Sequence, residues 1–268
     1  MEEQLINSAR APYYVQSLER GLAVIRVFDA ANPELTLSEV AHAAGMTRAS
    51  ARRFLLTFVA LGYVQTDGRR FRLTPRILDL GYAYMSNVGL SDLSQPHLEW
   101  LVKEVRESSS VCVLDGDDIV YIARVPTTRI MTVSISVGTR FPAYLTSVGR
   151  VLLAHLPEQE IALHLQRAPY DRPTSHTIAS ATMLHQELNR IRSQGYAIVD
   201  QELEEGLRSV AAPIRNHSGD VIAAINIPVH AGRNTVSSIR RDLVPPLLAA
   251  ASRIEADLRL LPRQPSGE

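Results

Sequence analysis

The chain has 268 residues, with 28 Lys or Arg and 28 Asp or Glu, so its formal net charge is zero. This length suits two domains, and 46% hydrophobic with 21% charged residues is ordinary for a globular protein. No apolar run approaches the ~20 residues that cross a bilayer. The acidic start Met1-Glu2-Glu3 is unlike a signal peptide, so we expect a cytoplasmic protein without membrane contact. Cys112 is the only cysteine, which excludes an internal disulfide and a thiolate zinc cluster.

Three helices are predicted near the N-terminus. Apolar residues at helical spacing predict the first over 16–30, where Asn32-Pro33 ends it. The second helix ends at Gly45, because a glycine takes positive φ without strain. Thr47 suits the N-cap of the third helix. The buried face of that third helix is predicted to be Phe54, Leu55, Phe58 and Leu61. The last two helices form a helix-turn-helix, whose second helix lies in the major groove of DNA.

A two-stranded wing is predicted directly after this helix. Tyr63-Val64 begins a strand, Asp67-Gly68 is a hairpin turn, and Phe71 and Leu73 alternate with arginines on the return strand. Between Thr47 and Arg76 there are seven arginines and one acidic residue, a local net charge of +6. A basic patch on a neutral chain favours binding to DNA phosphates. The alternative is an ordinary helical hairpin whose arginines form a solvated face.

The predicted partner is double-stranded DNA. Residues 48–53 are expected to contact base edges, and residues 69–72 the flanking backbone or minor groove. The predicted DNA-binding residues are Ser38, Thr47, Arg48, Ala49, Ser50, Arg52, Arg53, Arg69, Arg70 and Arg72.

The rest of the chain is predicted to hold a linker helix and a larger second domain. We expect a winged helix-turn-helix over 14–75, a linker helix over 76–90, a second domain over 91–262 and a disordered tail over 263–268. Helices are predicted over 94–107, 147–156, 183–194 and 236–260, with Pro245-Pro246 kinking the last one. Strands are predicted over 111–114, 119–124, 130–137, 197–200, 209–215 and 221–229. Because hairpins dominate, the fold class is α+β with a mainly antiparallel sheet.

Motifs for metal binding or catalysis are weak. Asp115, Asp117 and Asp118 fit a hairpin turn better than a calcium loop, whose further ligands do not follow. The eight histidines show no i, i+4 pair, and we expect neither a metal nor a cofactor. Glu202, Glu204 and Glu205 could serve hydrolysis, but a solvated loop is the better interpretation. We therefore predict no enzyme. The alternative is a carboxylate-processing enzyme with an accessory DNA-binding module.

Three separate segments predict a small-molecule pocket. A loop with small residues leads into the helix that begins at Ser147, and free N–H groups at a helix start favour anions. A second loop, residues 205–209, leads into a strand, and Asn226 interrupts another apolar strand, where a buried amide needs a partner. Together these features favour a pocket for a small carboxylate. A helix cap, a turn and a sheet-edge Asn are the alternatives.

The arrangement resembles the IclR (isocitrate lyase regulator) family of bacterial transcription factors over about residues 14–260. In the N-terminal region the resembling segments are 17–22 (SLERGL), 37–41 (LSEVA) and 61–64 (LGYV), with Phe71 in the wing. In the second domain they are Gly138-x-Arg140-x-Pro142, 147–154 (SVGRVLLA) and 205–214 (EGLRSVAAPI). Segments 14–25, 47–53 and 78–84 are most similar to the subgroup that controls protocatechuate, para-hydroxybenzoate and β-ketoadipate pathways.

The resemblance implies a winged helix-turn-helix, a linker helix and a GAF-like α/β effector domain. It also implies a homodimer, often a dimer of dimers, on a palindromic operator. The effector would be a small carboxylate, in this subgroup an aromatic acid or its catabolite. By position, the family's effector pocket falls on Met131, Val133, Tyr144, Ser147, Val148, Ser209, Asn226 and Pro228, with Asp200 beside Val199 where some members place an Asp.

Overall fold

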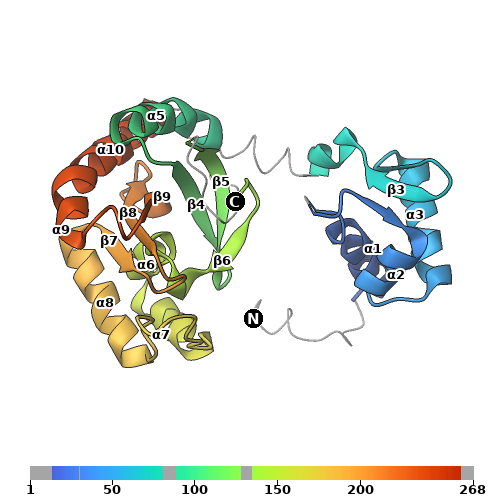
Figure 1. Cartoon of the computed structure of the whole chain (residues 1–268), viewed down its shortest axis with the longest axis horizontal. Helices are drawn as coiled ribbons and strands as arrows, with labels where there is room; N and C mark the ends of the chain where they lie inside the picture. Colours follow the sequence, from blue (N-terminus) through green and yellow to red (C-terminus); the bar gives the residue numbers. More distant parts are fainter. Residues whose placement is uncertain (1–13, 30, 81–88, 128–134, 261–268) are drawn as a thin grey trace. The chain divides into compact units, whose positions relative to one another are not determined.

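The computed structural model describes residues 14–29, 31–80, 89–127 and 135–260. The chain divides into two compact units, residues 1–87 and 88–268 (Figure 1). Three predictions lie outside the described residues: most of the linker helix, the tail, and most of the strand over 130–137 with Met131 and Val133. Within the described ranges, the model contains no helix with the length and apolar character that a membrane crossing needs.

The described part of the N-terminal unit contains three α-helices and a three-stranded antiparallel sheet. Its elements are α1 (Gln16–Arg26), β1 (Glu34–Thr36), α2 (Leu37–Ala43), α3 (Arg48–Leu61), β2 (Val64–Thr66), β3 (Arg70–Leu73) and a 3-10 turn, Pro75–Leu78. The strand order is β1-β3-β2, so the predicted wing hairpin is confirmed and gains a third strand. The three helices and β3 share one hydrophobic core, to which each contributes a buried side chain: Val24, Val40, Leu55 and Phe71, respectively.

Local chemistry sets the helix-turn-helix. The Thr36 hydroxyl accepts from the Glu39 N–H and the Glu39 carboxylate accepts from the Thr36 N–H, a capping box that starts α2. Gly45 has φ of +62°, in the left-handed region that ends this helix. The Thr47 hydroxyl then accepts from the Ser50 N–H at 3.2 Å and starts α3. The sequence predicted both the glycine stop and the threonine cap.

Two details of this unit differ from the prediction. The first helix ends at Arg26 instead of residue 30, because the Asp29 carboxylate accepts from the N–H groups of Ala31 and Asn32 and holds a turn there. Leu61, predicted to be buried, is 51% exposed at the end of α3, whereas Ala51 and Leu55 are fully buried.

The C-terminal unit is a six-stranded antiparallel sheet between two layers of helices. The strand order is β6-β5-β4-β9-β8-β7, with all described pairs antiparallel, as predicted. The strands are β4 (Ser109–Asp115), β5 (Asp118–Val125), β6 (Arg140–Pro142), β7 (Ala197–Asp200), β8 (Leu207–Arg215) and β9 (Val221–His230). Side chains alternate along β9, so Ile225 and Ile227 face one helical layer and Ala224 faces the other.

The two helical layers bury separate cores. α5 (Leu90–Val105) and α10 (Val244–Leu260) lie together on one face of the sheet (Figure 1). α6 (Ser147–Ala154), α7 (Glu158–Arg167) and α8 (Ala181–Gln194) cover the other face. Near the two prolines, where a kink was predicted, Ile239–Leu243 form a π-helical turn, because the missing proline N–H groups cannot close regular helical bonds. A short helix, α9 (Val236–Ser238), precedes that turn.

Candidate functional site

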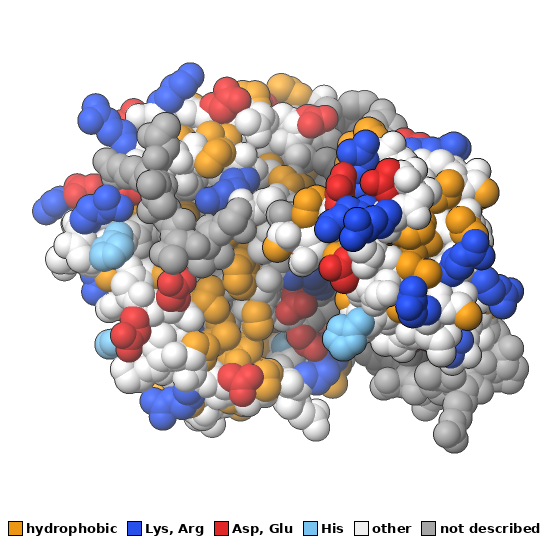
Figure 2. Space-filling model, turned by 45° about the vertical axis from the view of Figure 1, so that its right-hand side comes forward, with side chains coloured by type: hydrophobic (Ala, Val, Ile, Leu, Met, Phe, Trp, Pro, Cys, Tyr) orange, Lys and Arg blue, Asp and Glu red, His pale blue; other side chains and the backbone are white. Residues whose placement is uncertain are grey.

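The predicted DNA-contacting residues are almost all exposed on the N-terminal unit. Nine of the ten are exposed, and Ser50 is half-buried. Thr47 begins α3, the three arginines Arg48, Arg52 and Arg53 follow on its first two turns, and Arg69 and Arg70 lie at the wing turn. Figure 2 shows several arginine side chains exposed on this unit. α3 therefore presents cations outward while Ala51 and Leu55 hold its opposite face in the core.

These arginines differ in their protein partners. Among the described residues, Arg48, Arg52, Arg53 and Arg69 have no ion pair. Arg72 instead makes a 3.1 Å ion pair with Glu34 of β1. The Asp67 carboxylate accepts from the N–H groups of residues 69 and 70 and shapes the wing turn. The arginines of α3 are therefore available for phosphates or base edges, and Arg72 is partly neutralised within the protein.

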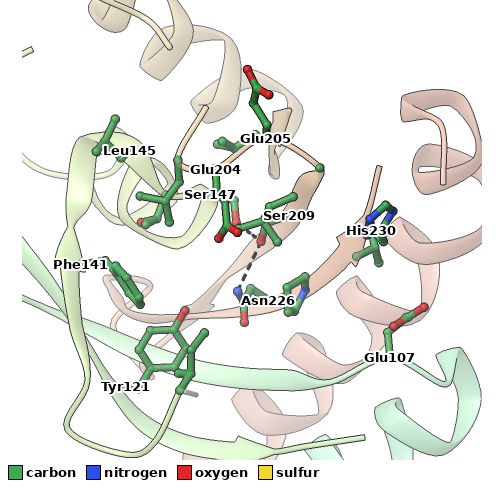
Figure 3. Close-up of a pocket in the computed structure, with 18 of the residues that line it drawn as sticks. Glu107, Tyr121, Phe141, Leu145, Ser147, Glu204, Glu205, Ser209, Asn226 and His230 are labelled. Carbon is green, nitrogen blue, oxygen red and sulfur yellow. Dashed lines mark hydrogen bonds between the residues drawn. The ribbon is translucent and has the colours of Figure 1, made fainter. Parts of the chain in front are cut away.

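The C-terminal unit contains a cavity of about 390 Å³ on the α6 side of its sheet. Apolar walls come from Tyr121, Phe141, Leu145 and Val199. The lining also includes three acidic residues, Glu107, Glu204 and Glu205, together with Ser147, Ser209, Asn226, Pro228, His230 and Arg233 (Figure 3). This size and mixture of apolar walls with a few polar groups is typical of a small-molecule site.

A cluster of uncharged polar groups lies at the start of α6. The hydroxyl oxygens of Ser147 and Ser209 are 2.7 Å apart, and the Asn226 amide nitrogen donates to the Ser209 hydroxyl at 3.4 Å (Figure 3). The Asn226 side-chain oxygen is buried and has no hydrogen-bond partner among the described residues. Buried polar atoms are normally satisfied, so this acceptor suits a donor from a bound molecule or water.

The packing of α6 explains the spacing in its motif. A Cβ atom at Gly149 would lie 2.1 Å from the Ala143 carbonyl oxygen, so only glycine lets α6 pack this closely against the backbone of Ala143. The Thr146 hydroxyl caps the helix by accepting from the Gly149 N–H at 3.0 Å. The glycine and the cap together bring Ser147 to the cavity wall.

A buried ion pair fixes the neighbouring loop. The Arg150 guanidinium donates to both carboxylate oxygens of Glu202 at 2.6 Å, and its Nε donates to the Tyr144 carbonyl. Arg150 is 1% exposed and Glu202 8%. Glu202 also accepts from the Ile178 N–H. The pair therefore ties α6 to the segment that leads into the cavity-lining residues 203–206.

Of the residues predicted for the pocket, the structure brings together Ser147, Ser209, Asn226 and Pro228 on the cavity wall. Tyr144 and Val148 lie instead in the buried core beneath α6. Asp200 forms a 2.6 Å ion pair with Arg208 rather than lining the cavity, where its neighbour Val199 stands.

Sequence reasoning missed Tyr121 and Phe141 in the wall. The alternation of β5 carries a signal for Tyr121, because it places this residue on the same face as Ile119. Burial raises the pKa of the Tyr121 phenol far above its usual range, so its hydroxyl stays protonated and can donate.

Among the described residues, no group of three or more His, Cys, Asp or Glu side chains is placed to hold a metal ion. Asp115 and Asp118 pair with Arg140 at the hairpin turn, and Asp117 pairs with His164 and Arg167. The Glu202 carboxylate is engaged by Arg150, while Glu204 and Glu205 are exposed on the cavity rim. Burial also raises the pKa of the Cys112 thiol, which keeps it protonated and inert.

A winged helix-turn-helix and a ligand-sized cavity in one chain define a ligand-responsive transcriptional regulator. Two family models match: the IclR helix-turn-helix domain over residues 17–68 and the bacterial transcriptional regulator IclR C-terminal domain over residues 82–256. The chain belongs to the IclR family. It is a DNA-binding transcriptional regulator and not an enzyme.

Individual relatives place it within the family. The chain is 43% identical over 241 residues to the Pca regulon regulatory protein of Pseudomonas putida, covering 90% of this chain and 83% of that one. It is 34% identical to the Pca operon regulatory protein of Acinetobacter baylyi over 90% of this chain and 88% of that one. Among solved structures, an IclR homolog from Microbacterium hydrocarbonoxydans in complex with 4-hydroxybenzoate superimposes with a TM-score of 0.82 at 26% identity, covering 91% of this chain and all of that one.

Proposed function

We propose that the chain regulates genes for the breakdown of aromatic compounds in response to a small aromatic acid or one of its catabolites. The effector binds in the cavity of the C-terminal unit, and α3 with the wing binds the operator. The relatives named as Pca regulators and the homolog with 4-hydroxybenzoate support the choice of effector class.

The observation that carries this proposal is the pairing of apolar and aromatic walls with uncharged hydrogen-bonding groups in one cavity. Tyr121, Phe141 and Leu145 suit a flat ring or a short apolar chain. The Ser147 and Ser209 hydroxyls bond to each other, so the one that accepts in this bond keeps its own proton free to donate to an oxygen of the ligand. A ligand of this kind would bury its apolar body and satisfy the polar groups at the start of α6.

Effector binding changes transcription by altering how the two winged helix-turn-helix domains of a dimer bind a palindromic operator. We propose a homodimer, because each half of a palindrome needs its own α3. Its further assembly into a dimer of dimers is proposed from the resemblance to the family alone. The effector shifts the equilibrium between two arrangements of these domains, and the size of the shift is set by the difference in its affinity for the two arrangements.

The test is a fluorescence-anisotropy titration of the intergenic DNA beside the chain's own gene, with and without 4-hydroxybenzoate, protocatechuate and adipate. At least one of these compounds should change the operator affinity and should raise the thermal midpoint of the protein. Ser209→Ala should weaken that response, because it removes one hydrogen bond at the cavity wall. If no compound changes either quantity, the effector class is wrong. DNA binding would stand on the titration without ligand.

A further inference from the structure

The strand β9 places polar side chains at two separate positions on the cavity wall. Its alternate residues Asn226, Pro228 and His230 all line the cavity, as expected for side chains that share one face of a strand. Four residues along an antiparallel strand span about 13 Å, so His230 lies well away from Asn226. Figure 3 shows His230 on the side of the cavity away from Ser147. The polar cluster at the start of α6 and His230 are therefore separated by the apolar Pro228.

The hydrogen bonding of His230 makes it a neutral donor. The Gly232 N–H donates to Nδ1 of His230 at 3.0 Å, so Nδ1 holds a lone pair and the proton of the ring is on Nε2. The His230 side chain makes no other hydrogen bond with a described residue, which leaves Nε2 without an acceptor there. A Cβ atom at Gly206 would lie 3.7 Å from Nε2, and Gly206 lines the same cavity. The Nε2–H group is therefore available to a ligand in the cavity.

The turn that follows His230 is held in place by an arginine of the neighbouring strand. The Arg208 guanidinium donates to the carbonyl oxygens of Ala231 and Asn234, at the two ends of this turn. The Asp200 carboxylate accepts from Nε of Arg208 at 2.6 Å and provides its counter-charge. Because the turn carries the N–H group that bonds to the imidazole, these contacts keep the ring in its orientation.

Donors at both ends of an apolar wall suit a ligand with two oxygen groups. The pair of Ser147 and Ser209 has one free hydroxyl proton at the start of α6, and His230 has its Nε2–H at the other end. A molecule with an apolar middle and an oxygen group at each end accepts both hydrogen bonds. A molecule with a single oxygen group accepts only one of them, so it should bind more weakly.

We propose that His230 is a specificity-determining residue whose Nε2–H binds a second oxygen group of the effector, at the end of the cavity away from the start of α6. This inference rests on the proposed function and narrows the effector to molecules with two oxygen groups. Two ligand sources share this chemistry: an aromatic acid with a ring hydroxyl opposite its carboxylate, and an aliphatic dicarboxylate.

The test compares acids with and without the second oxygen group by isothermal titration of the full-length protein. One pair is 4-hydroxybenzoate and benzoate, and the other is adipate and hexanoate. In at least one pair the wild type should bind the first compound about 5- to 10-fold more tightly. His230→Leu should abolish this preference, and His230→Gln should keep most of it, because the glutamine amide also supplies an N–H donor. The pair with the preference that depends on His230 identifies the ligand source.

Controls separate this inference from a general loss of structure. His217→Leu makes the same change at an exposed histidine outside the cavity lining and should leave the preference intact. Should H230L not fold, His230→Ala provides the same ratio of affinities. An unchanged ratio in the folded variants overturns the assignment of His230, and so does a preference lost only in Arg233→Gln, whose side chain also lines the cavity. Failure of every acid to bind the wild type would instead overturn the proposed effector class.

Discussion

Arg52 and Arg53 on α3 are exposed and have no ion pair with a described residue, whereas Arg150 on α6 is 1% exposed and donates two hydrogen bonds to Glu202. Arg124 lies between these extremes: it is half-buried, and its one hydrogen bond within the described part of the chain is to the neutral Ser110 hydroxyl. The same residue type thus serves different purposes according to its surroundings. An arginine whose charge is matched internally holds the fold, and one whose charge is unmatched is available to a partner.

The largest effect is expected at the buried ion pair of Arg150 and Glu202. Glu202→Ala leaves the Arg150 guanidinium buried without a counter-charge, and loss of one partner of such a pair costs about 3–5 kcal/mol. Urea unfolding followed by the fluorescence of Trp100, the only tryptophan, should show this loss in the C-terminal unit. The exposed pair Arg241–Asp242 provides the control, and Asp242→Ala should change the transition little.

A second pair of variants separates charge from packing in that result. Replacing both partners, as Arg150→Met with Glu202→Leu, removes the unpaired charge and should recover much of the lost stability. Equal stability of the wild type and Glu202→Ala would mean that the ion pair does not hold the loop.

The exposed arginines of α3 should behave in the opposite way to the buried Arg150. Arg52→Ala and Arg53→Ala remove exposed side chains, so neither should change the unfolding transition. Each should weaken operator binding by about 1–3 kcal/mol for a lost base contact, or reduce the salt dependence if the contact is to phosphate. Anisotropy titrations at two salt concentrations distinguish these outcomes. Arg26→Ala, at the end of α1 on the same unit, is the control. Wild-type affinity in both variants would show that α3 does not read the DNA.

The sequence predicted features that depend on local patterns. The stop at Gly45, the cap at Thr47 and the wing turn at Asp67-Gly68 each need only a few neighbouring residues, and all three are present. Five strands of the second unit were predicted from their apolar runs, but β6 lies in residues 138–143, which were predicted to be a loop. α7 was not predicted, because only Ile161 on it is buried and Leu163 is 41% exposed, which leaves little apolar periodicity.

Features that depend on distant residues were not predictable. Arg150 and Glu202 are 52 positions apart, and neither segment indicates that the other will neutralise it. Ile122 of β5 has no residue opposite it on β4, and this bulge places Arg124 on the same face of the sheet as Tyr121. No glycine or proline in β5 indicates the bulge in the sequence. For the same reason the pocket prediction identified serines next to recognisable loops and missed the wall residues contributed by the middle of β5.

A smaller effect tests how α3 is held in place. Thr47→Ala removes the hydroxyl that accepts from the Ser50 N–H, and loss of such a cap costs about 1 kcal/mol. Thr47→Ser keeps the acceptor and should keep most of the stability. Far-UV circular dichroism follows the helices of both units and Trp100 fluorescence follows the C-terminal unit alone, so unfolding of this unit is the part of the dichroism change that the fluorescence does not share. If the alanine variant loses operator affinity without losing stability, Thr47 acts through DNA contact instead of through the cap.

The smallest effect concerns pH and the capping box of α2. Hydrogen bonds from Thr36, first from its backbone N–H and then from its hydroxyl, lower the pKa of the exposed Glu39 carboxyl. A depressed folded-state pKa adds stability above the unfolded value of about 4.3, and this stability is lost as the pH falls through the folded-state pKa. Glu39→Gln carries the neutral group at every pH, so the wild type should be more stable at pH 6 and should converge with the variant towards pH 3. Parallel unfolding curves across this range would mean that the Glu39 charge adds nothing to the stability of the helix-turn-helix.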